Sequence, residues 1–155
     1  MHPETPPARR YPARESLHVE KNSPFIFITA CTKDRRPLLA NEKVHQTLRD
    51  AWLNCKDWRV GPYVLMPDHV HILVRPISFH PLPVRRWVAW WKRLTSEALT
   101  LHRNELWQRD IWDHRLRSKD SFAEKAEYIR NNPVRRGLVE QTDLWPFGGY
   151  IYNIR

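Results

Sequence analysis

Residues 66–74 read MPDHVHILV, and this stretch decides the fold that the sequence predicts. The runs 59–66 and 69–75 are rich in β-branched and aliphatic residues, as strands are. Only Pro67 and Asp68 separate the two runs, which predicts a tight turn between antiparallel strands. We therefore expect a β-hairpin with its turn at these two residues.

The two histidines of this stretch are candidate metal ligands. Successive side chains of a strand point to opposite faces, so His69 and His71 lie on one face, about 7 Å apart. The aliphatic residues at 70, 72 and 74 then face the core. Two imidazoles in this arrangement can take neighbouring positions around one divalent ion; two surface histidines are the alternative interpretation. Asp68 either forms the turn or orients one of the rings.

The rest of the chain adds strands and helices around this hairpin. The patterns predict a strand at 25–32, a helix from the N-cap Asn41 to about Asp57, a helix at about 83–102, a strand within 107–117 and a last helix starting at Ser118 or Asp120. That helix should stop by Pro133, because proline disfavours helical geometry at the residue before it. The order β-α-β-β-α-β-α predicts an α+β fold, a ferredoxin-like sandwich of an antiparallel sheet with helices mainly on one face.

The length and charge of the chain indicate one domain with a polyanionic partner. It has 155 residues, enough for one hydrophobic core, and 26 Lys and Arg against 17 Asp and Glu, a net charge of +9. Such a surplus favours nucleic acid as the partner, and a basic protein without one is the alternative. We expect a flexible basic N-terminal arm over residues 1–23, the folded domain over 24–140 and a C-terminal tail over 141–155.

The cysteines and the hydropathy of the sequence indicate the cellular compartment of the protein. Cys31 and Cys55 are far apart and have no CxxC spacing, which argues against a disulfide framework or a cysteine-bound zinc and fits a reducing cytosol. No apolar run reaches the length of about 18 residues that a membrane span needs, and no secretory leader is visible. The expectation is a soluble, cytoplasmic, nucleoid-associated protein.

The last predicted helix offers a nucleophile and an oxygen ligand. Tyr128 and Asn132 are four residues apart and so share one helix face, separate from the apolar side marked by Phe122, Ala126 and Ile129. The amide oxygen of Asn132 is a hard donor suited to Mg²⁺ or Mn²⁺. An ordinary structural role is the alternative: the asparagine caps the helix before the proline, and the tyrosine packs with its hydroxyl at the surface.

Three phrases in this order carry a family resemblance. They are MPDHVH at 66–71, the block from WQR at 107–109 to DHR at 113–115, and YIRNNPVRRGLV at 128–139. Together they resemble the IS200/IS605-like single-tyrosine HUH transposases, and within them the branch of REP-associated tyrosine transposases. The resemblance spans about residues 24–140.

The resemblance implies an enzyme that cuts and rejoins single-stranded DNA. His69 and His71 match the metal-binding histidines, Tyr128 matches the nucleophile, and Asn132 stands where relatives carry a third ligand, often Gln. The family's chemistry implies a divalent metal, Mg²⁺ or Mn²⁺, no nucleotide cofactor, and a 5′-phosphotyrosine intermediate that a DNA 3′-hydroxyl can reverse. The implied partner is single-stranded DNA next to a REP-like hairpin, bound by a monomer or a homodimer.

Basic residues in two regions are candidate DNA contacts. In the helix at 83–102, four cations alternate with Trp87, Trp90 and Trp91, a combination suited to phosphates and unstacked bases, although Trp87 and Trp91 also fit the core stripe. A second group flanks the presumed site. The predicted DNA-binding residues are Arg85, Arg86, Lys92, Arg93, Arg115, Arg117, Arg130, Arg135 and Arg136.

Two other functions compete with the strand transferase. One is a domesticated relative that holds DNA hairpins and cuts little or not at all. The other is an RNA-binding ferredoxin-like domain, for which the aromatic RNP1 signature is missing.

Overall fold

The predicted hairpin lies inside the sheet of the computed structural model, which describes residues 24–117 and 119–155. It consists of β2 (Trp58–Leu65) and β3 (His69–Pro76), which pair antiparallel. The turn closes through a hydrogen bond of 2.8 Å from the Met66 amide to the His69 carbonyl. The hairpin and its turn are therefore as the sequence predicts. The predicted arm at 1–23 falls outside the described residues.

Three further strands complete an antiparallel sheet of order β4-β1-β3-β2-β5. They are β1 (Ile26–Cys31), β4 (Trp112–Arg115) and β5 (Gly148–Tyr150). β1 pairs with β3 and β4, and β5 pairs with β2. The predicted α+β, ferredoxin-like arrangement is confirmed.

The sequence did not predict β5, which lies in the segment expected to be a tail. A side chain at Gly61 of β2 would come within 2.7 Å of Ile154. Glycine there lets the last residues of the chain lie directly on β2, where the Tyr152 amide bonds to the Val60 carbonyl at 2.9 Å. The end of the chain is therefore packed on the sheet.

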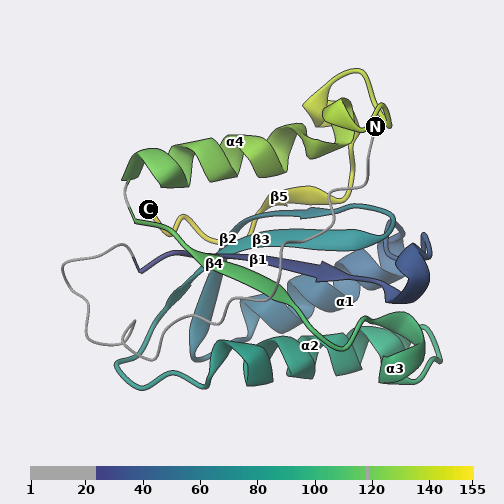
Figure 1. The fold of residues 1–155 in the computed structure, drawn as a ribbon, viewed down its shortest axis with the longest axis horizontal. Helices are drawn as coiled ribbons and strands as arrows, with labels where there is room; N and C mark the ends of the chain where they lie inside the picture. Colours follow the sequence, from purple (N-terminus) through teal and green to yellow (C-terminus); the bar gives the residue numbers. More distant parts are fainter. Residues whose placement is uncertain (1–23, 118) are drawn as a thin grey trace.

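The helices cover the sheet unequally (Figure 1). On one face lie α1 (Glu42–Leu53), α2 (Val84–Ala98) and α3 (Arg103–Leu106), and on the other lies α4 (Lys119–Arg135). Two short 3-10 turns, at Lys33–Arg35 and Thr142–Leu144, lie in the connections. In the described part of the chain, none of the helices is long and apolar enough to cross a membrane.

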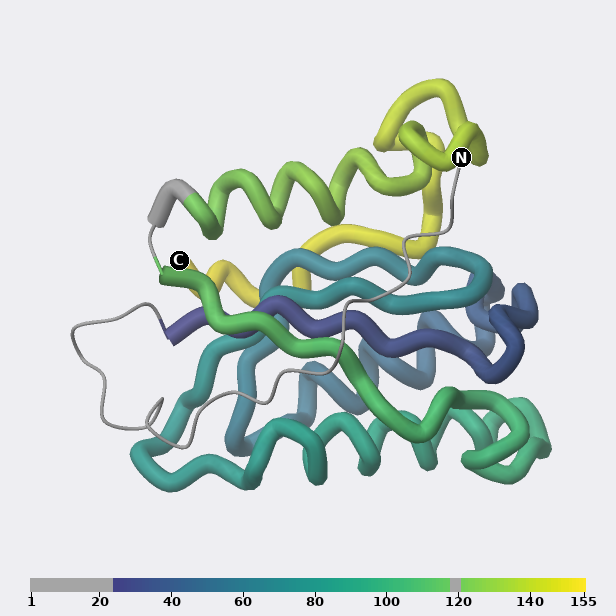
Figure 2. The backbone as a smooth tube through the Cα atoms, viewed as in Figure 1, coloured from purple at the N-terminus to yellow at the C-terminus, as the bar shows by residue number. Residues whose placement is uncertain are grey.

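Each face of the sheet has its own hydrophobic core. Ile28, Val70 and Ile72 point toward α1 and α2, where Trp52 and Trp91 are buried. The alternate residues of the same strands point toward α4 and pack with Phe122 and Ile129; among them are Phe27 and Leu73. In Figure 2, viewed as in Figure 1, the strands of the sheet lie between α4 on one side and α1 and α2 on the other. The face of the sheet that carries His69 and His71 is therefore the one beneath α4.

Two helix ends differ from prediction. The Asn41 side chain accepts from the Val44 amide at 3.0 Å, as an N-cap does, but α1 ends at Leu53, before the expected Asp57. α2 ends at Ala98, because Thr100 takes a left-handed conformation with φ of 56°. The helix predicted at 83–102 is therefore shorter than expected, and the separate helix α3 begins just after its predicted end, at Arg103.

The expected stop of the last helix at Pro133 is wrong, because α4 continues to Arg135. Proline removes only the one hydrogen bond that its own nitrogen would donate. Pro133 and Asn132 are both buried, so their packing stabilises the additional turn. Two residues beyond the end of the helix, Gly137 turns the chain with a φ of 71°, which is easy for glycine.

Candidate active site

His69 and His71 lie side by side on β3, beneath α4. Their ring centroids are 4.5 Å apart and their planes meet at 71°. The exposed fractions are 2% for His69 and 4% for His71. The predicted common face is confirmed, and the alternative of two surface histidines is wrong.

Each imidazole is oriented through its Nδ1 atom. Thr29, which faces His71 across the β1–β3 pairing, shares a hydrogen bond of 2.7 Å between its Oγ1 and His71 Nδ1. His69 Nδ1 donates to Asp68 Oδ1 at 2.7 Å, and Arg35 Nε donates to the other carboxylate oxygen at 2.8 Å. Asp68 therefore orients a ring as well as standing in the turn. Both rings keep Nε2 for another partner.

Burial and neighbouring charge keep both imidazoles in the neutral form. Burial lowers the pKa of His69, against the opposing effect of the Asp68 carboxylate. Burial lowers the pKa of His71 further, and the charges of Arg136, Arg135 and Lys125 act in the same direction. The Asp68 carboxyl loses hydration on burial, but hydrogen bonds from His69 and Arg35 outweigh this and hold its pKa well below the usual range. Neutral imidazole is the form that binds a metal.

Tyr128 on α4 packs directly over this pair. Its ring meets His71 edge to face, with centroids 5.5 Å apart, and Phe27 at 6.0 Å. Two cations lie beside the ring: Arg135 Cζ is 3.9 Å from its centroid and Lys125 Nζ is 5.5 Å from it. Positive charge here stabilises negative charge that develops on the phenolic oxygen.

Asn132 lies one turn beyond Tyr128 on the same face of α4 and is completely buried, with 0% of its surface exposed. Neither Oδ1 nor Nδ2 of this amide has a hydrogen-bond partner, and neither does His71 Nε2. Arg136, one turn further along, lowers the pKa of both histidines through its charge. Asn132 therefore lies on α4 between Tyr128, whose ring packs on His71, and Arg136, whose charge lowers the pKa of both histidines.

The unpartnered atoms fit a metal ligand set. Buried polar atoms in native proteins nearly always have partners, and the unpaired atoms of His71 and Asn132 include an imidazole nitrogen and an amide oxygen, which are donors that a divalent ion accepts. Within residues 24–117 and 119–155, no three His, Cys, Asp or Glu side chains surround a common point. The residues present thus suit an ion held by two imidazoles and an amide oxygen, with its other positions open to water or phosphate.

Comparison with known proteins assigns the family. The family described as "Transposase IS200 like" matches residues 25–132, from the residue before β1 to Asn132. The chain belongs to the IS200-like transposase family. The resemblance drawn from the sequence is confirmed.

Two curated relatives of this transposase share 28% identity with it. One is the REP-associated tyrosine transposase of Escherichia coli K12, matched over 83% of this chain and 77% of the relative. The other is a putative REP-associated tyrosine transposase of Haemophilus influenzae, with coverages of 84% and 82%. A solved REP-associated tyrosine transposase bound to a REP hairpin superposes with a TM-score of 0.71 at 24% identity, over 96% of this chain and 82% of that one. That last likeness shows a common fold.

The predicted basic residues of the transposase do not form one surface. Arg85, Arg86 and Arg93 lie on α2, on the face of the sheet away from Tyr128. Lys92 is 4% exposed, and its Nζ donates to the Gln108 carbonyl at 3.0 Å. Burial lowers the pKa of Lys92 to about 8. The structure therefore removes Lys92 from the exposed basic set.

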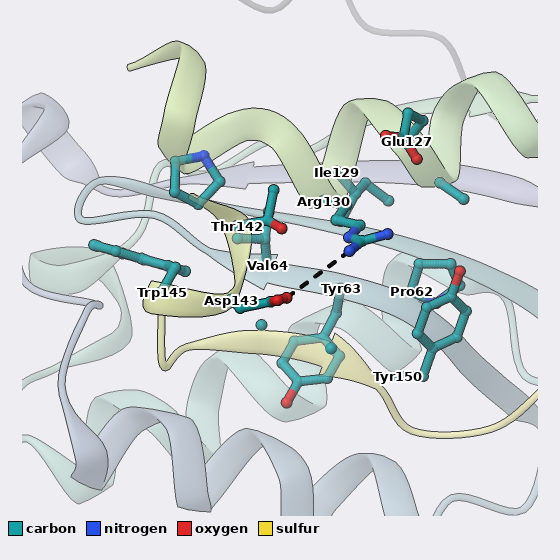
Figure 3. Close-up of a pocket in the computed structure, with 14 residues that line it drawn as sticks. Pro62, Tyr63, Val64, Glu127, Ile129, Arg130, Thr142, Asp143, Trp145 and Tyr150 are labelled. Carbon is teal, nitrogen blue, oxygen red and sulfur yellow. Dashed lines mark ion pairs between the residues drawn. The ribbon is translucent and has the colours of Figure 1, made fainter. Parts of the chain in front are cut away.

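The second group of predicted DNA-binding residues lies closer to Tyr128 and the two histidines. Arg135 and Arg136 lie next to Tyr128 and the histidines, while Arg115 is half-buried on the edge strand β4 and Arg117 is exposed just after it. Arg130 points to the other side of α4 and pairs with Asp143 at 3.8 Å. Figure 3 shows this pair inside a hollow of about 420 Å³ between α4, β2 and β5.

Sequence reasoning missed the residues that hold the site in place. Thr29 and Arg35 orient the imidazoles, and Lys125 lies over the Tyr128 ring. The family phrases do not include these residues. Only the alternation of β1, which puts Thr29 on the same face as Phe27, could have indicated the first of them.

Proposed function

We propose that this IS200-like transposase is a metal-dependent single-stranded DNA endonuclease and strand transferase that acts next to DNA hairpins. The observation that carries the proposal is the Tyr128 ring against His71, whose Nε2 has no partner, with the unpartnered amide of Asn132 one turn away. Family membership supports the reaction class. The solved relative bound to a REP hairpin supports the kind of DNA.

Tyr128 acts as the nucleophile in the proposed reaction. Its phenolic oxygen attacks the scissile phosphorus and gives up its proton, forming a bond between tyrosine oxygen and phosphorus. The bond from phosphorus to the 3′-oxygen of the preceding nucleotide breaks, and that oxygen takes up a proton. The 5′-phosphate remains on the protein. A DNA 3′-hydroxyl can reverse the step by attacking the same phosphorus, so no nucleotide cofactor is consumed.

His69, His71 and Asn132 would hold the divalent ion, Mg²⁺ or Mn²⁺. When bound, such an ion neutralises charge on a non-bridging phosphate oxygen and helps to position the phosphate. The protein contributes the orientation of the ligands: Thr29 and Asp68 fix the two rings through Nδ1. Correct orientation of second-sphere partners affects metal affinity about 10- to 100-fold.

The cations around Tyr128 complete the chemistry. Lys125 and Arg135 lie over its ring, and Arg136 acts on the histidines below. These three charges offset the negative charge of the phosphate and of the attacking oxygen. Because the site lies between α4 and the sheet, the DNA must present a strand that can bend into it. An unpaired strand next to a hairpin meets that requirement.

A cleavage assay tests the proposal. A labelled hairpin with an unpaired 5′ extension is incubated with the protein and Mg²⁺ or Mn²⁺, with EDTA, and with a fully paired duplex in place of the hairpin. We expect the protein to cut only within the unpaired extension, and only when Mg²⁺ or Mn²⁺ is present. Binding without cleavage under all conditions would favour a hairpin-binding protein instead.

A further inference from the structure

Two aromatic side chains stack on each other at the edge of the sheet, near the candidate active site. Trp112 and His114 alternate with Asp113 along β4, the edge strand next to β1. The two rings are nearly parallel, with centroids 6.0 Å apart and planes at 12°. Both residues are half-buried, whereas Asp113 points to the opposite face and is buried. We call Trp112 and His114 the edge pair.

The strand pairing places the edge pair on the face of the sheet that carries the candidate metal ligands. In the β1–β4 pairing, Trp112 is opposite Thr29 and His114 is opposite Phe27. Residues opposite each other in antiparallel strands share one face. Thr29 shares a hydrogen bond with His71, and the Phe27 ring stacks on the His71 imidazole at 5.2 Å. The edge pair therefore lies beside the metal site, on the same surface.

A single ring separates the edge pair from the candidate nucleophile. Phe27 meets Trp112 edge to face at 5.6 Å and meets Tyr128 in the same way at 6.0 Å. Lys125 of α4 lies over the same ring, with its Nζ 5.0 Å from the Phe27 centroid. A phosphate held by Lys125 at Tyr128 would thus have Trp112 within reach of the base of an adjoining nucleotide.

The helix above this face leaves the edge pair accessible. α4 packs mainly against β2 and β3, and β1 lies between β3 and β4. The edge strand is therefore displaced to the side of α4, which agrees with the partial exposure of both rings. Trp112 contributes to the core beneath α4 through its contact with Phe27. That packing does not require a second ring stacked on the indole.

The chemistry of the edge pair suits an unpaired nucleobase. The cations near Tyr128 can bind phosphate, but they offer no flat apolar surface to a base. Tryptophan and histidine rings are surfaces on which unstacked bases lie, and such stacking tolerates any base because every base has a π face. Bases inside a duplex already stack on their neighbours, so an unpaired strand is the form that can use this surface.

We propose that the edge pair binds, by stacking, the unpaired base of a nucleotide that adjoins the scissile phosphate. This inference rests on the proposed function and adds a base-binding site to it. The stacked base anchors the strand at β4, so that the phosphorus lies within reach of the Tyr128 oxygen. A purine should bind more tightly than a pyrimidine, because its larger ring system covers more of the aromatic surface.

The experiment combines a change in the protein with a change in the DNA. Trp112→Leu removes the indole, and the probes are hairpins whose unpaired flank carries one abasic site, moved along it one nucleotide at a time. Fluorescence anisotropy in EDTA measures affinity without cleavage. In wild type, an abasic site at one position beside the cut should weaken binding about tenfold. Trp112→Leu should bind the intact probe about tenfold more weakly, and the same abasic site should then change its affinity less than about twofold.

Two further variants complete the test. Phe79→Leu is the control, because its ring is 82% exposed in the connection between β3 and α2, and this variant should match wild type with every probe. His114→Ala removes the other ring of the edge pair and should also reduce the abasic effect, which keeps the test decisive if Trp112→Leu does not fold. An abasic effect of equal size in wild type and in the folded variants would overturn the proposal, as would a wild type that tolerates abasic sites at every position.

The proposed function is judged separately, by cleavage of the intact hairpin by wild-type protein with Mn²⁺. A wild type that cleaves but shows no abasic effect overturns only the base-binding site. A wild type that does not cleave, but whose abasic effect disappears in Trp112→Leu, supports the base-binding site and rejects the strand transferase.

Discussion

The phenol ring of Tyr128 meets the imidazole of His71 edge to face, with 5.5 Å between centroids and 69° between planes. This contact joins α4 to β3 and sets the candidate nucleophile above the candidate metal ligands. Because Thr29 holds Nδ1 of His71, its Nε2 is the atom that remains for a ligand.

Replacing either histidine by asparagine should abolish cleavage. The Asn amide reaches about as far as Nδ1, so His71→Asn keeps a partner for Thr29 but has no atom where Nε2 stood. Hairpin affinity should remain within about twofold, because phosphate contacts elsewhere dominate it. His80→Asn, at an exposed position, is the matched control. Cleavage at the wild-type rate in His69→Asn or His71→Asn would remove the metal from the mechanism.

Asn132→Leu should separate folding from metal binding. Leucine has nearly the shape of asparagine and removes two buried polar atoms that have no partner. An unsatisfied buried group costs about 1–3 kcal/mol, so the metal-free variant should be more stable than wild type by an amount of that order. Thermal melts with and without Mn²⁺ test this. Wild type should be stabilised by the ion and the variant should not; an equal shift in both would exclude Asn132 as a ligand.

Thr29→Val should weaken the metal site without removing it. Valine keeps the size of threonine but lacks the hydroxyl that orients His71. Loss of such a partner typically lowers metal affinity about 10- to 100-fold. Cleavage should therefore need more Mn²⁺ and recover at saturation, with hairpin binding unchanged. A defect that excess metal does not relieve would show that Thr29 matters only for packing.

Acid should destabilise the metal-free protein as the pH falls below about 6.5. Burial lowers the pKa of His71 and His69 in the folded state, while the unfolded chain titrates near pH 6.5. The unfolded state then binds more protons, so stability is complete above that pH and is lost as pH falls, by at most about 1.4 kcal/mol per pH unit for each histidine. His45 has a lowered pKa too and adds to the slope.

Urea unfolding at several pH values measures this slope. His71→Asn should show a shallower dependence than wild type, because one titrating group is gone. Asp68 does not interfere, since its carboxyl titrates well below this range. Identical slopes in variant and wild type would show that His71 is not held in the neutral form by the fold.

The sequence predicted those parts of the fold that depend on local periodicity. Alternation along residues 69–75 places His69 and His71 on one face whatever the tertiary structure. β5 was missed because Gly148 and Gly149 have little strand propensity and pair with β2 only through the backbone. The end of α4 was misplaced because the rule for residues before proline is local, whereas burial of Asn132 and Pro133 is a tertiary effect.

The site was predicted as a set of residue types and not as a set of contacts. Tyr128 and Asn132 follow from their spacing on one helix and from the family phrases. Arg35, which lies far from Asp68 in the sequence, was not predicted to hold it. Lys92 was predicted to contact DNA because it is one of four cations interleaved with tryptophans. Its Nζ instead donates to the carbonyl of Gln108, which no helical pattern relates to it.

The most direct measurement is the search for a covalent protein–DNA adduct. Wild-type protein and Tyr128→Phe are incubated with a hairpin that carries an unpaired 5′ extension and Mn²⁺, then denatured, digested and analysed by mass spectrometry. Phenylalanine keeps the ring and its packing against His71 and Phe27, so the variant should fold and bind as wild type does. The proposed mechanism predicts DNA linked through its 5′-phosphate to Tyr128 in wild type, and neither adduct nor cleavage in the variant. An adduct on Tyr150 or Tyr152, or cleavage that persists in Tyr128→Phe, would contradict it.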